Sequence, residues 1–367
     1  MTVAPFHDTS PRSPSSGSGT VWPAAPVADD DLGEAAADVT AELPAPRRRL
    51  PVWAPWLLGR LGSGAVAVLA LSAIVFAATQ ALPSDPARVI LGPDAPEATA
   101  RILRAQLGLD QPLATQYLHW LGRAVHGDFG RSLDSHVPVI DLVARRLGNS
   151  LVLLGAVAAF VLPLALVLGV GLALRRDGRL DRATVTSLIV LKALPPFAVA
   201  IGLTMLLSTS VFELLPAVSL VEADRPLWRQ LPYLVLPTLT LGLSTLPYLV
   251  RLVRSSMIEV LETDYVMQAR LRGIPERRLV WRHAIPNALV PAIQGAALTM
   301  SVLLGGTLVV EVMFAYPGIG SALSAAVGAR DIPVLQGVVL ILTTGVVGVN
   351  LLADLLTVLL TPRLRVA

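Results

Sequence analysis

Residues 150–174 read SLVLLGAVAAFVLPLALVLGVGLAL, a run of twenty-five residues without a charged side chain. About twenty consecutive apolar residues in an α-helix cross the hydrocarbon core of a bilayer. Five further apolar runs of similar length lie at about residues 62–82, 183–208, 231–250, 288–312 and 334–360. The sequence therefore predicts an all-α, polytopic membrane protein with six transmembrane helices.

The composition agrees with a membrane protein and excludes several kinds of chemistry. Hydrophobic residues make up 54% of the chain and charged residues only 15%, against about 25% charged residues in soluble domains. The absence of cysteine excludes disulfides, thiolate metal sites and a cysteine nucleophile. Lys192 is the only lysine, and Leu191 and Ala193 flank it, so the chain has no Gly-Lys-Ser/Thr phosphate-binding loop. We expect no ATPase site, enzyme activity, cofactor or metal on this chain.

The distribution of arginine predicts which ends of the spans face the cytoplasm. Seventeen arginines flank the spans on one side, and the two short loops on the other side carry three. Basic residues accumulate on the cytoplasmic side of bacterial membrane proteins. This places both termini in the cytoplasm, with residues 361–367 as the C-terminal segment. Residues 1–50 are rich in Pro, Ser, Ala and Asp, and we expect a disordered cytoplasmic tail there.

A basic stretch, DYVMQARLRGIPERRLVWRHAIPNALVP at residues 264–291, separates two of the apolar runs. Its spacing predicts a first helix to about Arg272, ended by Gly273 in the left-handed conformation. Pro275 is placed where a second helix begins, because its missing N–H is not needed there. Pro286 is expected to close the segment before the next apolar run. Such a charged loop must project into water, where it can bind another protein.

This stretch resembles the EAA loop of ABC importer permeases, in the version found in the dipeptide/oligopeptide (and nickel) permease family. The matching residues are Asp264, Tyr265, Ala269, Arg270, Gly273, His283, Pro286 and Asn287. The resemblance implies a type I transmembrane domain at 147–358, with a coupling loop at 254–287 that docks on an ATPase subunit. It also implies a second homologous permease, two ATPase subunits that bind ATP and Mg²⁺, and an extracytoplasmic substrate-binding protein.

The segment between the first span, at 57–82, and the second resembles the same family. Residues 83–146 form a long loop, expected outside the cytoplasm, that contains SDPARVILGPD, LGLDQP and GDFGRSL. Within it, ATARILRAQLG predicts a helix ended by Gly108, and QYLHWLGRAV predicts a second helix. FAYPGIGSAL and RDIPVLQG extend the match beyond the fifth span. The resemblance runs in the same order from about residue 57 to 366.

Five residues in the apolar part are candidates for the translocation pathway. Lys192 lies about ten residues into the third run, and an ionisable group at such depth is a functional-site hypothesis. It either faces the pathway and attracts an anionic group of the substrate, or pairs with Asp354 or Glu311, or is reached by cavity water. Pro195 and Pro196 predict a kink, or a hinge in a cavity wall. Glu311, at the end of the fifth run, is expected to reach water, whereas Asp354 needs a partner.

The function expected from these features is an ATP-driven, binding-protein-dependent importer permease for di- or oligopeptides, working by alternating access. The alternative is a secondary transporter or channel that does not use ATP, and an intramembrane enzyme is a third class. Secondary transporters show internal repeats and several ionisable groups at the membrane midplane. The sequence shows no obvious repeat and only two deep ionisable groups, Lys192 and Asp354. The cargo, whether peptide, nickel complex or glutathione, is left open.

Overall fold

The computed structural model describes residues 53–81, 91, 96–107, 110–209, 212–219 and 230–360. The predicted tail at 1–50 and the C-terminal segment at 361–367 lie outside the described residues. All described residues belong to one compact unit, Leu50–Ala367. The regular elements of the described part are helices, and its one β feature is an isolated bridge between Arg131 and Pro138.

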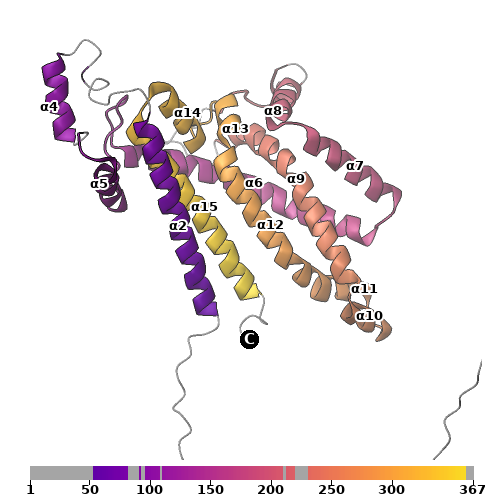
Figure 1. The fold of residues 1–367 in the computed structure, drawn as a ribbon. Helices are drawn as coiled ribbons and strands as arrows, with labels where there is room; N and C mark the ends of the chain where they lie inside the picture. The colour runs from indigo at the N-terminus through magenta and orange to yellow at the C-terminus, as the bar shows by residue number, and fades with distance from the viewer. Residues whose placement is uncertain are drawn as a thin grey trace, which may run out of the picture. The chain divides into compact units, whose positions relative to one another are not determined.

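Five helices of the described part are long and apolar enough to cross a membrane, and a bent helix pair gives a sixth candidate. Figure 1 shows α2 and α15 side by side, with the remaining long helices beyond them. The prediction of a multi-pass, all-helical membrane protein is confirmed. Four candidate spans are single helices: α2 (Trp53–Gln80), α6 (Val139–Leu174), α9 (Leu231–Leu261) and α15 (Ile332–Leu360). A fifth is one continuous helix made of α11 (Glu276–Leu279), the π-turn η3 (Val280–Ala284) and α12 (Ile285–Gly306). The bent pair consists of α7 (Arg179–Ala193) and α8 (Pro196–Thr204), which continues into the π-turn η1 (Met205–Thr209).

The third span differs most from the prediction, because residues 183–208 do not form one straight helix. The helices α7 and α8 meet at 100°. Leu194, between them, is extended with φ −78° and ψ 127°, as expected of a residue before proline. Pro195 and Pro196 also lack the N–H groups that would continue the helix. A kink was predicted at this point, and the structure has a complete break.

Other span boundaries differ because hydropathy marks only the part of a helix that fits in lipid. Helix α6 begins at Val139, eleven residues before the predicted start, and α9 runs on to Leu261, past the predicted end at 250. These added turns are polar but keep their backbone hydrogen bonds. In contrast, α12 ends at Gly306, and a separate short helix, α13 (Leu308–Met313), holds the remainder of the fifth run.

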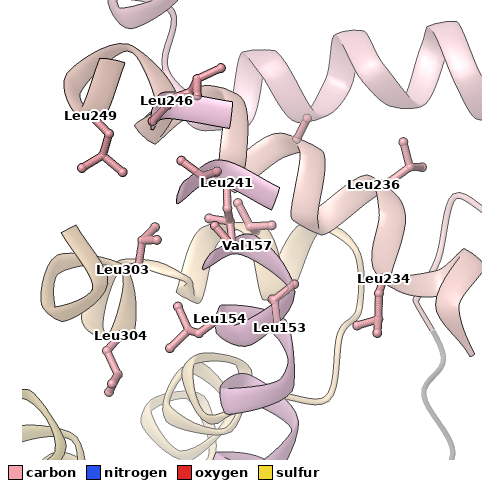
Figure 2. Packing of buried hydrophobic residues seen from close by; sticks show 14 of the residues in the cluster. Leu153, Leu154, Val157, Leu234, Leu236, Leu241, Leu246, Leu249, Leu303 and Leu304 are labelled. Carbon is pink, nitrogen blue, oxygen red and sulfur yellow. The ribbon is translucent and has the colours of Figure 1, made fainter. Parts of the chain in front are cut away.

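The core lies where α6, α9 and α12 meet. Figure 2 shows leucine and valine side chains from these three helices converging, among them Leu153, Val157, Leu241 and Leu303. Small residues allow close approach: a Cβ added to Gly169 of α6 would lie 2.7 Å from Val253 of α9. Membrane helices associate through such close packing, since lipid supplies little hydrophobic drive between them. The helices α6 and α9 therefore form the rigid centre of the bundle.

Two amphipathic helices precede α6, as the sequence predicts: α4 (Glu97–Leu107) and α5 (Leu113–Val125). Gly108, the predicted end of the first, lies outside the described residues. Tyr117 and Trp120 of α5 pack their rings on Phe76 of α2 at centroid distances of 5.6 and 5.7 Å. The Tyr117 hydroxyl also lies 2.8 Å from Ser72 Oγ. This aromatic contact ties α5 to the end of the first span.

Candidate functional site

The basic stretch of residues 264–287, named here the charged loop, is an ordered pair of helices. Its first helix, α10 (Asp264–Leu271), starts after Thr263 and ends at Gly273, whose φ is +75°. The Gly273 N–H donates to the Arg270 carbonyl at 2.9 Å, and the Ile274 N–H donates to the Ala269 carbonyl at 3.2 Å. These two bonds make a Schellman motif, in which glycine supplies the left-handed residue. The predicted helix stop at Gly273 is confirmed.

An ion pair crosses the turn that follows α10. Pro275, with φ −58°, directly precedes α11, close to its predicted place. Both oxygens of Glu276, the first residue of α11, accept hydrogen bonds from the Arg270 guanidinium, at 2.7 and 3.2 Å. This pairing raises the pKa of Arg270 above its usual value. The fork geometry fixes the angle between α10 and α11, although both side chains are partly exposed.

Pro286 does not close the segment as predicted, because the chain is helical without interruption from Glu276 to Gly306. A proline inside a helix removes one hydrogen bond and clashes with the carbonyl four residues before it. Here the π-turn at Val280–Ala284 directly precedes Ile285 and Pro286. Pro286 lies in the first turn of α12, directly after this change from π-helical to α-helical winding. The charged loop is therefore continuous with the fifth span.

Two of the predicted loop residues, Tyr265 and Asn287, are brought together by the fold. Asn287 Nδ2 lies 3.1 Å from the Tyr265 hydroxyl and 2.7 Å from the His283 carbonyl. This contact links α10 to the first turn of α12. His283 takes part through its main chain. Asp264 lies in the first turn of α10, where a carboxylate is favoured by the helix dipole.

The inner side of the charged loop is packed against the ends of the spans. Val266 and Leu279 are fully buried, and Val280 and Ala284 pack with Met257 of α9. The same cluster includes Ala173, close to the end of α6. The loop is therefore anchored to the two central helices of the bundle.

The outer side of the charged loop exposes apolar and basic residues together. Leu271 is 82% exposed and Trp281 is 67% exposed. Trp281 and Pro275 line a shallow hollow whose other walls are arginines. Exposed aromatic residues and arginine are enriched in the energetic centres of protein interfaces. Besides Arg270, which pairs with Glu276, the exposed arginines of the charged loop are Arg272, Arg277, Arg278 and Arg282.

The sequence analysis missed an ion pair that joins the spans behind the charged loop. Arg254 of α9 donates from Nε and Nη2 to the two oxygens of Asp181 at 2.8 and 2.6 Å. The Asp181 side chain is 3% exposed, and it also accepts the Asp177 N–H at 3.0 Å. A second, exposed pair joins Arg176 and Glu262 nearby. The sequence signal is weak: two acids, Asp177 and Asp181, lie within an arginine-rich turn whose arginines indicate topology.

Of the pathway candidates, Glu311 and Asp354 have partners inside the chain. Asp354 binds Arg60 of α2 at 2.7 Å. Glu311 does not reach water: it is completely buried and accepts from Ser150 Oγ at 2.7 Å, Thr307 Oγ1 at 3.0 Å and the Ser321 N–H at 2.9 Å. It thereby fixes the start of α14 (Ile319–Ala329) on α6. The predicted alternatives of Lys192 paired with Asp354 or Glu311 are wrong.

Lys192, Pro195 and Pro196 lie together at the break between α7 and α8, and all three are exposed in this chain. Lys192 lines a groove against α9, next to Pro247, Tyr248 and Arg251. An ionisable side chain and a broken helix therefore occupy the same surface.

The sequence of the chain matches two family descriptions. Residues 165–366 match the "Binding-protein-dependent transport system inner membrane component", and residues 54–154 match the N-terminal part of such membrane components. The chain belongs to this family. Its members are permease subunits of ABC importers, and this chain is one of them.

The chain aligns with relatives over nearly the whole length of each relative. A protein of Brucella abortus (strain 2308), named for a peptide transport system permease, is 35% identical over 310 residues, which are 84% of this chain and 98% of the relative. The glutathione transport system permease protein GsiC of Escherichia coli (strain K12) is 35% identical over 295 residues, 80% of this chain and 94% of that protein. The recognised resemblance to importer permeases is confirmed.

Proposed function

We propose that this permease carries small peptides or peptide-like acids inward, driven by ATP that partner subunits bind and hydrolyse with Mg²⁺. The names of the relatives, which include peptide and glutathione permeases, support this cargo. The remaining partners are a second homologous permease and an extracytoplasmic binding protein. The binding protein delivers cargo to the outer surface formed in part by α4 and α5, in the long segment between the first two spans.

The observation that carries this proposal is the construction of the charged loop. Its outer side presents Leu271, Trp281 and four arginines, a surface suited to a groove of an ATPase subunit. The Schellman turn, the Arg270–Glu276 pair and the Tyr265–Asn287 contact hold its two helices together, and its inner side packs on α9 and α6. A force on the outer side is therefore transmitted to α9 and α12 rather than lost in a flexible linker.

In this mechanism the charged loop is the coupling element of an alternating-access cycle. Closure of the ATPases on ATP displaces the loop, and the helices that it contacts, α6, α9 and α12, move with it. The spans open outward, accept cargo from the binding protein, and reset after hydrolysis. The break at Pro195 and Pro196 forms part of the cavity wall. Glu311 and Asp354 position helices, because their partners lie within this chain.

The proposed orientation places the charged loop and both termini in the cytoplasm. The arginine distribution supports it. Figure 1 shows α10 and α11 at the same end of the long helices as the start of α2 and the end of α15. A single orientation thus puts the basic loop, the start of α2 and the end of α15 on one side.

The test is a Gly273→Val variant of the assembled complex. Valine at φ +75° is strained, at a cost of about 1–3 kcal/mol, so the turn between α10 and α11 changes. We expect the ATPase subunits to co-purify in reduced amount and cargo-stimulated hydrolysis to fall. Gly155→Val is the matched control, since a Cβ at Gly155 of α6 meets no atom within 4 Å. Full ATPase recovery and full stimulation with Gly273→Val would contradict the coupling role.

A further inference from the structure

A groove between α7 and α9 gathers cationic and hydroxyl groups at the depth of the spans. Its volume is about 440 Å³, and its polar lining comprises Lys192 of α7 with Tyr248, Arg251, Arg254 and Ser255 of α9. Lys192 and Arg251 are both exposed to the groove surface rather than packed in the core. Lys192 and Arg251 belong neither to the contacts of the charged loop nor to the hydrophobic core described above.

The charges in this groove do not balance. The charge of Arg254 is paired, because its Nε and Nη2 donate to the two oxygens of Asp181. Among the residues that the structure describes, no carboxylate lies within 4 Å of Lys192 or of Arg251, and neither side chain donates a hydrogen bond. Cations within a membrane-spanning segment are costly, and they ordinarily face a cavity and pair with a counter-ion. Two unpaired cations in one groove therefore indicate that an anionic group binds there.

The broken helix beside the groove indicates that water, cargo or the second permease, rather than lipid, covers this surface. Residues Lys192–Phe197 are all exposed, although the backbone turns there by 100°. Pro195 and Pro196 have no N–H groups to continue the helical hydrogen bonds, and the Leu191 carbonyl accepts from the Leu194 N–H at 3.2 Å instead. Non-helical backbone at membrane depth is tolerated only where protein covers it or where it lines a water-filled cavity. In secondary transporters, broken spans form the substrate site.

Lys192 lies well inside the bundle from the basic end, and Arg251 lies nearer to that end. Asp181, which pairs with Arg254, is in the first turn of α7, and Lys192 is in its last turn. Eleven residues of helix separate them, about 16 Å at 1.5 Å per residue. Arg251 lies one turn from Arg254 toward the centre of α9. The groove therefore extends from the end that carries the charged loop toward the interior of the spans.

From these observations we infer that Lys192 and Arg251 bind the carboxylate of the cargo on its way through the permease. The inference rests on the proposed transport of peptides, each of which carries a C-terminal carboxylate. The Arg251 guanidinium offers two parallel donors to a planar carboxylate, and the Lys192 ammonium adds a mobile charge. The hydroxyl groups of Tyr248 and Ser255 are further donors on the same wall. The site selects acids over neutral cargo of the same size.

The experiment measures ATP-dependent uptake by the complete complex in proteoliposomes, with its binding protein. The probes are a pool of di-, tri- and tetrapeptides and the same pool with C-terminal amides, each at concentrations that saturate the binding protein. The readout is the ratio of acid to amide uptake, in which the contribution of the binding protein is the same for every permease variant. The variants are Lys192→Met and Arg251→Gln. The control is Arg179→Gln, an exposed arginine at the other end of α7 and outside the groove.

We expect the ratio to fall at least tenfold in each groove variant, equivalent to about 1.4 kcal/mol, and to stay unchanged in the control. An unchanged ratio in both groove variants, with wild-type peptide uptake intact, would overturn this site and leave the proposed function standing. Absence of any peptide uptake by the wild type would contradict the proposed function and the site together.

Repeating the assay in liposomes with and without phosphatidylglycerol tests whether the anion bound in the groove is a lipid phosphate instead of the cargo. If the variants lost a lipid dependence while keeping the ratio, the groove would bind a lipid phosphate and the inference would be wrong.

Discussion

The buried pair between Asp181 and Arg254 predicts a large loss of stability when only one partner is removed. In Arg254→Met, Asp181 keeps its 3% exposure but loses both short bonds to the guanidinium, leaving only the Asp177 N–H at 3.0 Å. Removing one partner of a buried ion pair costs about 3–5 kcal/mol. Because the Arg254 side chain is 24% exposed, we take the lower limit, about 3 kcal/mol.

The assay is thermal unfolding of the purified complex, followed by the fraction that stays monodisperse in detergent. At roughly 2 °C per kcal/mol for a chain of this size, Arg254→Met should lower the midpoint by about 6 °C. The double variant Asp181→Asn with Arg254→Met should recover much of this loss, since no uncompensated charge remains. Arg176→Met, which breaks the exposed pair with Glu262, is the control and should change the midpoint far less. Equal midpoints for Arg254→Met and Arg176→Met would refute this account of the ion pair.

Three further predictions concern packing and hydrogen bonding. Gly169→Leu should prevent assembly of the complex in a co-purification assay, because its Cβ would meet Val253 at 2.7 Å. The control Gly171→Leu should assemble normally, because a Cβ at that position meets no atom within 4 Å. Glu311→Ala should lower the unfolding midpoint by several degrees, since it leaves two buried hydroxyls and one N–H without their acceptor; an unchanged midpoint would contradict this. Tyr265→Phe should keep the ATPase subunits bound but reduce coupled hydrolysis by a few-fold, because only the hydroxyl contact to Asn287 is lost; unchanged coupling would argue against that contact.

The features that the sequence predicted well are those decided by local chemistry. Five of the six apolar runs correspond to single long helices and the other to the bent pair α7–α8, because a run of about twenty apolar residues is typical of a membrane span. The Gly273 stop was predictable, since the left-handed conformation strongly favours glycine. The helices α4 and α5 followed from their amphipathic period.

The features that the sequence missed depend on contacts between distant segments. Arg60 and Asp354 are 294 positions apart, and no local pattern pairs them. The surroundings of Lys192 depend on how α7 lies against α9, which follows from the 100° break and from the Asp181–Arg254 pair. Proline usually ends a helix, so the sequence predicts a helix end at Pro286. The helix instead continues through it, directly after a π-turn that has no distinct sequence signature.

The central claim, that the charged loop is the contact with the ATPase, can be tested most directly by disulfide cross-linking. The chain contains no cysteine, so each introduced thiol is unique. Leu271→Cys, at a position 82% exposed on the loop, is paired with cysteines along the ATPase groove, and Val125→Cys, 76% exposed on α5, is the control. The account predicts cross-links in the assembled complex from residue 271 and none from residue 125. Cross-links from residue 125, with none from residue 271, would contradict it.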